Sequence, residues 1–136
     1  MTERDDLLAS IASTIKTYRQ GELPEPTPAH VDRWALQFSA ADQVPFLREF
    51  DHVIKQTFLT KDTVTTFLAN LVKNVNLAGT DPVAYWAKAN LLRIQKAGQS
   101  QKEMVSLFGV ALAQQCGLDV AKCGAEGGDY IYLDDV

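Results

Sequence analysis

Two adjacent acids, Asp134 and Asp135, stand directly after a short apolar and aromatic run near the end of this sequence. The run, residues 130–133, is aromatic and β-branched and predicts a buried β-strand. Ligands of α/β proteins bind at the carboxyl ends of strands, and side chains alternate between the two faces of a strand. One acid can therefore face a ligand, and Mg²⁺ prefers a few carboxylates plus substrate oxygens. The alternative is an acidic tail that keeps a terminal strand hydrated.

A second candidate for ligand binding is the segment 96–101, in which a glycine-containing loop enters a predicted helix. Ser100 and Glu103 have the spacing of a capping box, which predicts where this helix begins. The free backbone amides of a helix N-terminus bind anions, and Lys96 adds a positive charge. The segment is neither a Walker loop nor a dinucleotide fingerprint, and an ordinary capped turn is the alternative. Its candidate ligand-binding residues are Lys96, Gly98, Gln99, Ser100 and Gln101.

One βαβ unit over residues 89–136 would position both candidates. The apolar run 90–95 predicts its first strand, the segment behind Ser100 predicts its helix, and residues 130–133 predict its second strand. The loop after the first strand and the end of the second strand lie at the same edge of such a sheet. We therefore expect the loop 96–101 and the two acids to be neighbours, an arrangement that suits a phosphorylated sugar with a divalent metal.

The chain before this unit is predicted to be helical. Apolar residues at helical spacing indicate an N-terminal helix within residues 1–21, and three prolines interrupt the pattern in a linker over 22–28. Thr27 and Pro28 suit the cap and first position of the next helix, and a helical region fills residues 29–88. The predicted fold is therefore mainly α, with an N-terminal helical bundle followed by an incomplete βαβ unit of an α/β domain.

Composition narrows the class of protein. The 136 residues carry a net charge of −4 without a basic run, so nothing in the charge pattern indicates binding to nucleic acid. No apolar stretch is long enough to span a membrane and no secretory signal opens the chain, so we expect a cytoplasmic protein. Cys116 and Cys123 lack zinc-site spacing and are expected to be reduced thiols. His52, beside Asp51, is conceivable as a general base, and a surface hydrogen bond is the plainer role.

The sequence of residues 131–136 resembles the start of the phosphoribosyl-pyrophosphate loop of type I phosphoribosyltransferases. From about residue 28 to the end, the chain resembles the N-terminal part of phosphoribosyltransferase-like proteins of bacterial conflict systems, some linked to retrons. Besides the terminal acids, the stretches that carry this resemblance are residues 30–34, 50–57 and 95–104.

The resemblance implies a protein of antiviral defence that binds phosphoribosyl pyrophosphate or a nucleotide, with Mg²⁺ as cofactor. Asp134 and Asp135 would hold the ribose hydroxyls and the metal, and residues 96–101 would match the pyrophosphate loop. In the family the loop continues through a Thr-Gly turn that binds the 5′-phosphate, and this chain ends before that turn. The expectation is a truncated chain that does not catalyse phosphoribosyl transfer.

Two other functions fit parts of the sequence. The amphipathic helices of residues 1–88 would also suit an interaction module without catalysis, which binds a protein partner or forms a homo-oligomer. The sequence Tyr132-Leu133-Asp134-Asp135 also resembles the catalytic Tyr-x-Asp-Asp of reverse transcriptases. In those enzymes the acids lie in a β-hairpin turn, whereas the region upstream here is predicted to be helical.

Overall fold

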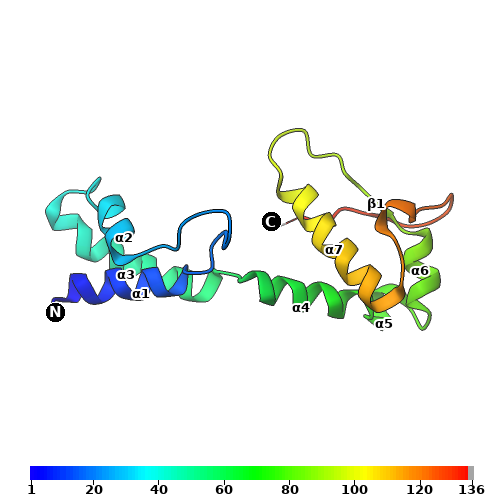
Figure 1. The fold of residues 1–136 in the computed structure, drawn as a ribbon, viewed down its shortest axis with the longest axis horizontal. Helices are drawn as coiled ribbons and strands as arrows, with labels where there is room; N and C mark the ends of the chain where they lie inside the picture. Colours follow the sequence, from blue (N-terminus) through cyan, green and yellow to red (C-terminus); the bar gives the residue numbers. More distant parts are fainter. Residues whose placement is uncertain (135–136) are drawn as a thin grey trace. The chain divides into compact units, whose positions relative to one another are not determined.

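The computed structural model describes residues 1–134, so Asp135 and Val136 lie outside the described residues. The chain forms two compact units, Met1–Lys61 and Asp62–Val136, shown in Figure 1. The elements are α1 (Glu3–Thr14), α2 (Pro28–Ala35), α3 (Ala40–Thr57), α4 (Lys61–Val72), α5 (Val75–Ala78), α6 (Pro82–Lys88), β1 (Asn90–Leu91), α7 (Ser100–Cys116), η1 (Val120–Lys122) and β2 (Tyr130–Ile131). The predicted fold class, mainly α with an incomplete β unit, is confirmed.

The first unit is a small helical bundle in which α1 packs against both α2 and α3. Thr2 caps α1 through a capping box with Asp5. Thr27 caps α2, with a proline at the first helical position, as the sequence predicts. The buried residues at the centre of the bundle are Leu8, Ile11, Ala12, Val31, Ala35, Leu47 and Ile54. Interdigitated aliphatic side chains from all three helices thus form one core.

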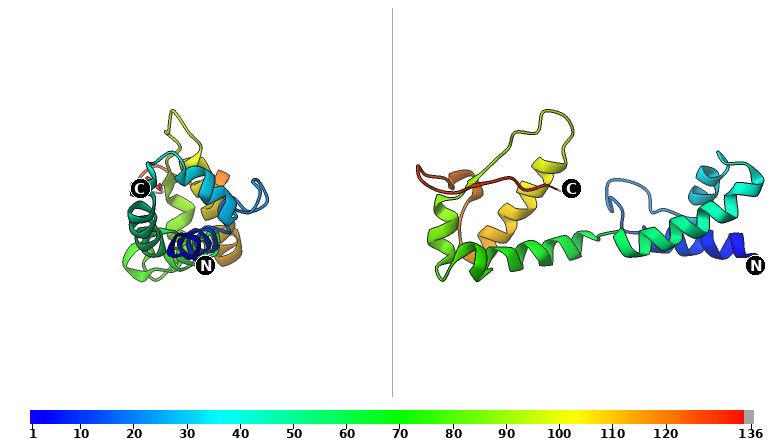
Figure 2. Two further views of the ribbon diagram at one scale, coloured as in Figure 1. Left: turned by 90° about the vertical axis from the view of Figure 1, so that its left-hand side faces the viewer. Right: turned by 180° about the vertical axis from the view of Figure 1, so that it is seen from behind.

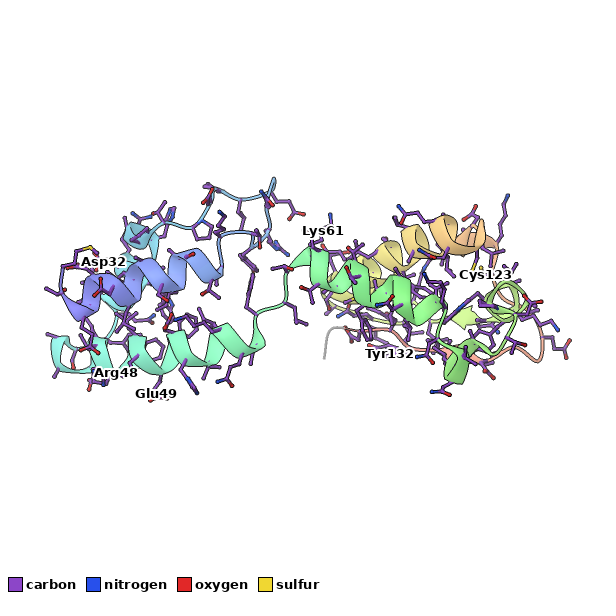
Figure 3. The ribbon with its side chains drawn as sticks, turned by 90° about the horizontal axis from the view of Figure 1, so that it is seen from below. Asp32, Arg48, Glu49, Lys61, Cys123 and Tyr132 are labelled. Atoms are coloured by element: carbon purple, nitrogen blue, oxygen red, sulfur yellow. The ribbon has the colours of Figure 1, made fainter. Side chains whose placement is uncertain are left out.

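Ion pairs also join α1 to its two neighbours. Arg4 pairs with Asp32 of α2 at 2.6 Å, and Arg48 of α3 pairs with Glu3 at 2.6 Å. Asp32 and Arg48 are labelled in Figure 3. Both pairs are partly exposed to solvent, so they orient the helices and add little to the free energy of unfolding.

A buried carboxylate, Asp51, lies between α1 and α3. Ser10 Oγ donates a hydrogen bond to Asp51 Oδ1 at 2.7 Å, and Lys55 Nζ donates to Asp51 Oδ2 at 2.7 Å. Burial acts to raise the pKa of Asp51, but the hydrogen bonds from Lys55 and Ser10 outweigh burial and hold that pKa below its usual value. Asp51 is therefore a structural anion in the folded unit.

The second unit is built around Trp86 of α6, which is 1% exposed. Its indole Nε1 donates to the Val72 carbonyl oxygen of α4 at 2.8 Å, and its ring meets the Phe108 ring of α7 with centroids 4.8 Å apart. The buried residues around it are Leu68, Val72, Ala78, Ala89, Phe108, Ala111 and Leu112. A single core therefore holds α4, α6 and α7 together.

A two-stranded parallel sheet completes the second unit. Asn90 pairs with Tyr130 and Leu91 pairs with Ile131, so α7 lies in the connection between the two strands. The predicted strands over 90–95 and 130–133 therefore exist but are shorter, because no further strand is present among the described residues to extend the ladder. The division between the units falls after Lys61, whereas the change of pattern in the sequence lies near residue 88.

The loop between η1 and β2 lies unusually close to the backbone at the end of α6. Asn90 Nδ2 donates to the carbonyl oxygens of Lys88, Ala125 and Gly128 at 3.2 to 3.4 Å. A Cβ atom at Gly128 would lie 2.0 Å from the Lys88 carbonyl oxygen. Only glycine fits at this position, two residues before β2.

Candidate functional site

The parallel pairing of β1 and β2 brings the two sequence candidates together at one edge of the sheet. In Figure 1 the chain leaves β1 in a long loop that leads into the N-terminus of α7, and Figure 2 shows the C-terminal segment running back toward the same end of that helix. Ser100 Oγ lies 3.5 Å from Asp134 Oδ1. The expectation that the loop and the terminal acids are neighbours is met for Asp134, and Asp135 lies outside the described residues.

Asp134 also accepts a hydrogen bond from Tyr132, a residue that the predicted ligand-binding residues do not include. The phenol of Tyr132, which is labelled in Figure 3, donates to Asp134 Oδ2 at 2.9 Å. Residues two apart on an extended segment point to the same face, so the alternation itself was a signal for Tyr132. Hydrogen bonds to both carboxylate oxygens orient the Asp134 side chain toward the start of α7.

A pair of glutamines closes the loop before α7. The backbone amide of Gln95 donates to Gln101 Oε1 at 3.0 Å, and the backbone amide of Gln101 donates to Gln95 Oε1 at 3.0 Å. Gln101 Nε2 also donates to the Leu92 carbonyl oxygen at 2.9 Å, and Gln95 Nε2 donates to Ser100 Oγ at 3.2 Å. Gln101 was a candidate for ligand binding, but it is fully buried, so it shapes the loop from within.

The predicted capping box at the start of α7 is wrong. The helix begins at Ser100, its cap is Gln99, and no side chain makes the capping hydrogen bond. Ser100 Oγ instead contacts Asp134, since the tertiary contact provides an acceptor for its hydroxyl. Within residues 1–134, the backbone amides of Ser100 and Lys102 make no hydrogen bond, so they are available donors at the positive end of the helix.

The other predicted residues of the loop are exposed. Lys96, Gly98 and Gln99 lie on the solvent side between β1 and α7. Gly98 has a φ of +80°, a left-handed conformation that glycine adopts without strain. The site therefore combines an exposed cationic and glycine-containing loop, free helix amides and an oriented carboxylate. This set of groups can hold a phosphate beside a hydroxyl-bearing sugar.

Other potential centres in the sequence are structural. His52 is exposed and its Nε2 lies 3.1 Å from Gln56 Nε2, while the neighbouring Asp51 is bound to Ser10 and Lys55, so no base–nucleophile pair forms there. In the part of the chain that is described, no group of three or more His, Cys, Asp or Glu side chains gathers as a metal cluster.

The cysteines also behave as packing residues. Cys116 and Cys123 are free and half-buried against the core of the second unit, and Figure 3 labels Cys123. Burial raises the pKa of both thiols, with a smaller contribution from a nearby aspartate in each case. Both thiols therefore remain protonated and weakly nucleophilic near neutral pH.

The chain topology bears on two further expectations. Among the helices of residues 1–134, none has the length and apolar character needed to cross a membrane. The strand before the terminal acids pairs in parallel with β1, whereas the reverse-transcriptase interpretation requires those acids in a β-hairpin turn.

Comparison with known proteins identifies one family. A family model described as PRTase-CE matches residues 31–136, which include the second half of α2, helices α3 to α7 and both strands, but not α1 or the proline-rich linker. Neither the curated proteins nor the solved structures contain a match to this chain.

Proposed function

We infer that this chain, which belongs to the phosphoribosyltransferase-like PRTase-CE family, binds phosphoribosyl pyrophosphate or a related nucleotide together with Mg²⁺. The proposed site lies where the loop 96–101 and the start of α7 meet Asp134. Residues of the loop would contact the pyrophosphate group, and the terminal acids Asp134 and Asp135 would contact the ribose hydroxyls.

The observation that carries this proposal is the contact between Ser100 and Asp134. The two residues are far apart in the sequence, yet Ser100 Oγ and Asp134 Oδ1 lie 3.5 Å apart because β1 and β2 pair in parallel. Without this contact, the loop with its free helix amides and the carboxylate of Asp134 would be two unrelated features. Side by side, they suit the two neighbouring groups of phosphoribosyl pyrophosphate, the diphosphate on C1 of the ribose and the hydroxyls on C2 and C3.

The donor set fits the chemistry of both groups. The amides of Ser100 and Lys102 and the ammonium group of Lys96 are donors for phosphate oxygens at the positive end of a helix. Mg²⁺ is usually held by one or two carboxylates plus substrate phosphate oxygens, so Asp134 alone, or with Asp135, suits it. The metal would neutralise charge on the diphosphate when it is bound.

Titration calorimetry with phosphoribosyl pyrophosphate and MgCl₂ tests the site. Asp134→Asn keeps the size of the side chain but removes its charge, and the double variant Asp134→Asn with Asp135→Asn removes both charges. A hydrogen bond to a charged group contributes about 1.5–3 kcal/mol, so we expect about 10- to 100-fold weaker binding in the single variant and no measurable binding in the double variant.

Glu126→Gln is the matched control, because Glu126 is an exposed acid in the glycine-rich loop before β2. It removes the same charge without touching the proposed site and should leave the affinity unchanged. Equal binding by the wild-type chain and the double variant would refute the proposed site.

We further propose a role in bacterial antiviral defence. The proposal is supported by the resemblance of residues 30–34, 50–57 and 95–104 to proteins of bacterial conflict systems, and by a family match over residues 31–136 that covers all of these stretches except residue 30. Plaque formation on a bacterial host is the direct test. Cells that express the wild-type chain should restrict a panel of phages, and cells that express the Asp134→Asn variant should not. Equal plating on both strains across the panel would argue against this role.

A second candidate function, self-association of the first unit, is favoured by a partly exposed aromatic cluster. Trp34, 41% exposed, contacts Phe38, Phe46 and Phe50, with ring centroids 5.0 to 5.9 Å from its own. Light scattering over a concentration series is the test. A mass that rises with concentration in the wild-type chain, and not in Trp34→Ala, would support self-association, and a constant monomer mass would refute it.

A further inference from the structure

Gln101 is the most completely buried polar side chain among the described residues of the second unit. It is 0% exposed, and both atoms of its amide group are hydrogen-bonded. Its carbonyl oxygen accepts from the Gln95 backbone amide, and its amide nitrogen donates to the Leu92 carbonyl oxygen. An apolar side chain of the same size could fill this volume without needing hydrogen-bond partners. The specific role of the Gln101 amide group is therefore to bind these two backbone groups.

The two backbone groups belong to the loop that leads from β1 to α7. Leu92 follows directly after β1, and Gln95 lies near the middle of the segment before the helix. The contact is reciprocal: the side-chain oxygen of Gln95 accepts a hydrogen bond from the Gln101 backbone amide at 3.0 Å. Three hydrogen bonds therefore fix the path of a segment that has no regular secondary structure.

The glutamine pair also reaches the acid at the end of the second strand. Gln95 Nε2 donates to Ser100 Oγ at 3.2 Å, and Ser100 Oγ contacts Asp134 Oδ1 at 3.5 Å. An amide nitrogen can only donate, so the hydroxyl hydrogen of Ser100 remains available for the carboxylate. The result is a directed chain of hydrogen bonds from the buried Gln101 through Gln95 and Ser100 to Asp134.

We propose that Gln95 and Gln101 are positioning residues of the candidate pyrophosphate loop. They hold the amides of Ser100 and Lys102 in the geometry that receives the diphosphate and keep the Ser100 hydroxyl in contact with Asp134, and neither glutamine side chain need contact the ligand itself. This inference rests on the proposed function. The inference adds that two glutamines determine the geometry of the loop, and that one of them, Gln101, is inaccessible to any ligand.

The test is calorimetric titration of the full chain with inorganic pyrophosphate and MgCl₂. Gln95→Leu removes the acceptor for the Gln101 amide and the donor to Ser100, while Gln101→Leu removes the two contacts to the loop backbone. Outer partners of ligand-binding groups contribute about 10- to 100-fold to affinity in metal sites, and we expect at least about a tenfold loss here for each variant.

A control variant separates positioning from stability. Phe108 lies in the same helix, about two turns beyond Gln101, and the Phe108→Leu substitution replaces a buried aromatic ring of the core by a smaller side chain. It should lower the melting temperature at least as much as Gln95→Leu does, yet leave pyrophosphate affinity within about twofold of the wild type, a change of less than about 0.5 kcal/mol.

The outcomes are distinguishable. A wild-type chain that binds pyrophosphate, with weakened Gln95→Leu and Gln101→Leu variants and an unaffected Phe108→Leu variant, supports the positioning role. Unchanged affinity in both glutamine variants, or an equal loss in the Phe108→Leu control, overturns the positioning role and leaves the proposed function standing. A wild-type chain that binds neither pyrophosphate nor phosphoribosyl pyrophosphate overturns both.

Discussion

Replacing Gly128 by alanine is expected to destabilise the second unit more than any other single methyl addition in its loops. The new Cβ would lie 2.0 Å from the Lys88 carbonyl oxygen, 2.7 Å from the Lys88 carbonyl carbon and 3.2 Å from the Ala125 carbonyl oxygen. All three atoms belong to the backbone, so no side chain can rotate to relieve the overlap. The loop must move away from the end of α6 by more than about 1 Å to restore ordinary contact distances.

That movement would stretch the hydrogen bonds that hold the loop in place. Ala125 N donates to the Lys88 carbonyl oxygen at 3.1 Å, and Asn90 N donates to the Asp129 carbonyl oxygen at 2.8 Å. Overpacking costs about 1–3 kcal/mol and each lost hydrogen bond about 1 kcal/mol. We therefore expect Gly128→Ala to lower the free energy of unfolding by about 2–5 kcal/mol.

Urea unfolding monitored by Trp86 fluorescence measures this loss of unfolding free energy. The Trp34→Phe substitution is made in every variant, so that Trp86 in the second unit is the only tryptophan that fluoresces. Gly127→Ala is the matched control, because Gly127 has a φ of +81° and no atom within 4 Å of an added Cβ. Its cost is the backbone strain of a left-handed alanine, about 1–2 kcal/mol. A Gly128→Ala variant as stable as Gly127→Ala would refute the reasoning.

Three further predictions follow from buried groups. Trp86→Phe should lower the free energy of unfolding by about 2–4 kcal/mol in urea titrations, because it leaves the Val72 carbonyl oxygen without its indole partner and opens a cavity. The lowered pKa of Asp51 means that its stabilisation is full above the unfolded pKa of about 3.9 and is lost as the pH falls through the folded value. Acid titration of stability should therefore be shallower in Asp51→Asn than in the wild type, and an unchanged slope would contradict the ion pair with Lys55. Iodoacetamide should alkylate Cys123 more slowly at pH 8 in the folded chain than in urea, since burial raises its thiol pKa, and equal rates would contradict its burial.

Features that depend on a few neighbouring residues could be predicted from the sequence. Thr27 before Pro28 predicted the start of α2, and a glycine such as Gly117, which has a φ of +67° at the end of α7, is a general signal for the end of a helix. Each signal acts through bonds within one helical turn, so no knowledge of the rest of the chain was needed.

Features that depend on distant partners could not be predicted in this way. Ser100 has the spacing of a capping residue, but its hydroxyl contacts Asp134 instead. Ile94 belongs to an apolar run that predicted a strand, yet it is 62% exposed, because no neighbouring strand among the described residues covers it. Gln95 and Gln101 gave no signal of their reciprocal contact, since glutamine is common in exposed loops and helices.

The parallel pairing of the two short strands has a consequence for the order in which the second unit folds. Asn90 pairs with Tyr130, so a loop of about 40 residues must close at a cost of about 3 kcal/mol in chain entropy. The backbone hydrogen bonds from Asn90 and Leu92 to the second strand offset only about 2 kcal/mol of that cost. Leu91, Ile131 and Leu133 pack against the core around Trp86, so we expect the strands to meet after that core has formed and to separate before the helices unfold. Ser100 and Asp134 are then brought together in the last step of folding, and hydrogen exchange at the Leu92 amide would report how often they part.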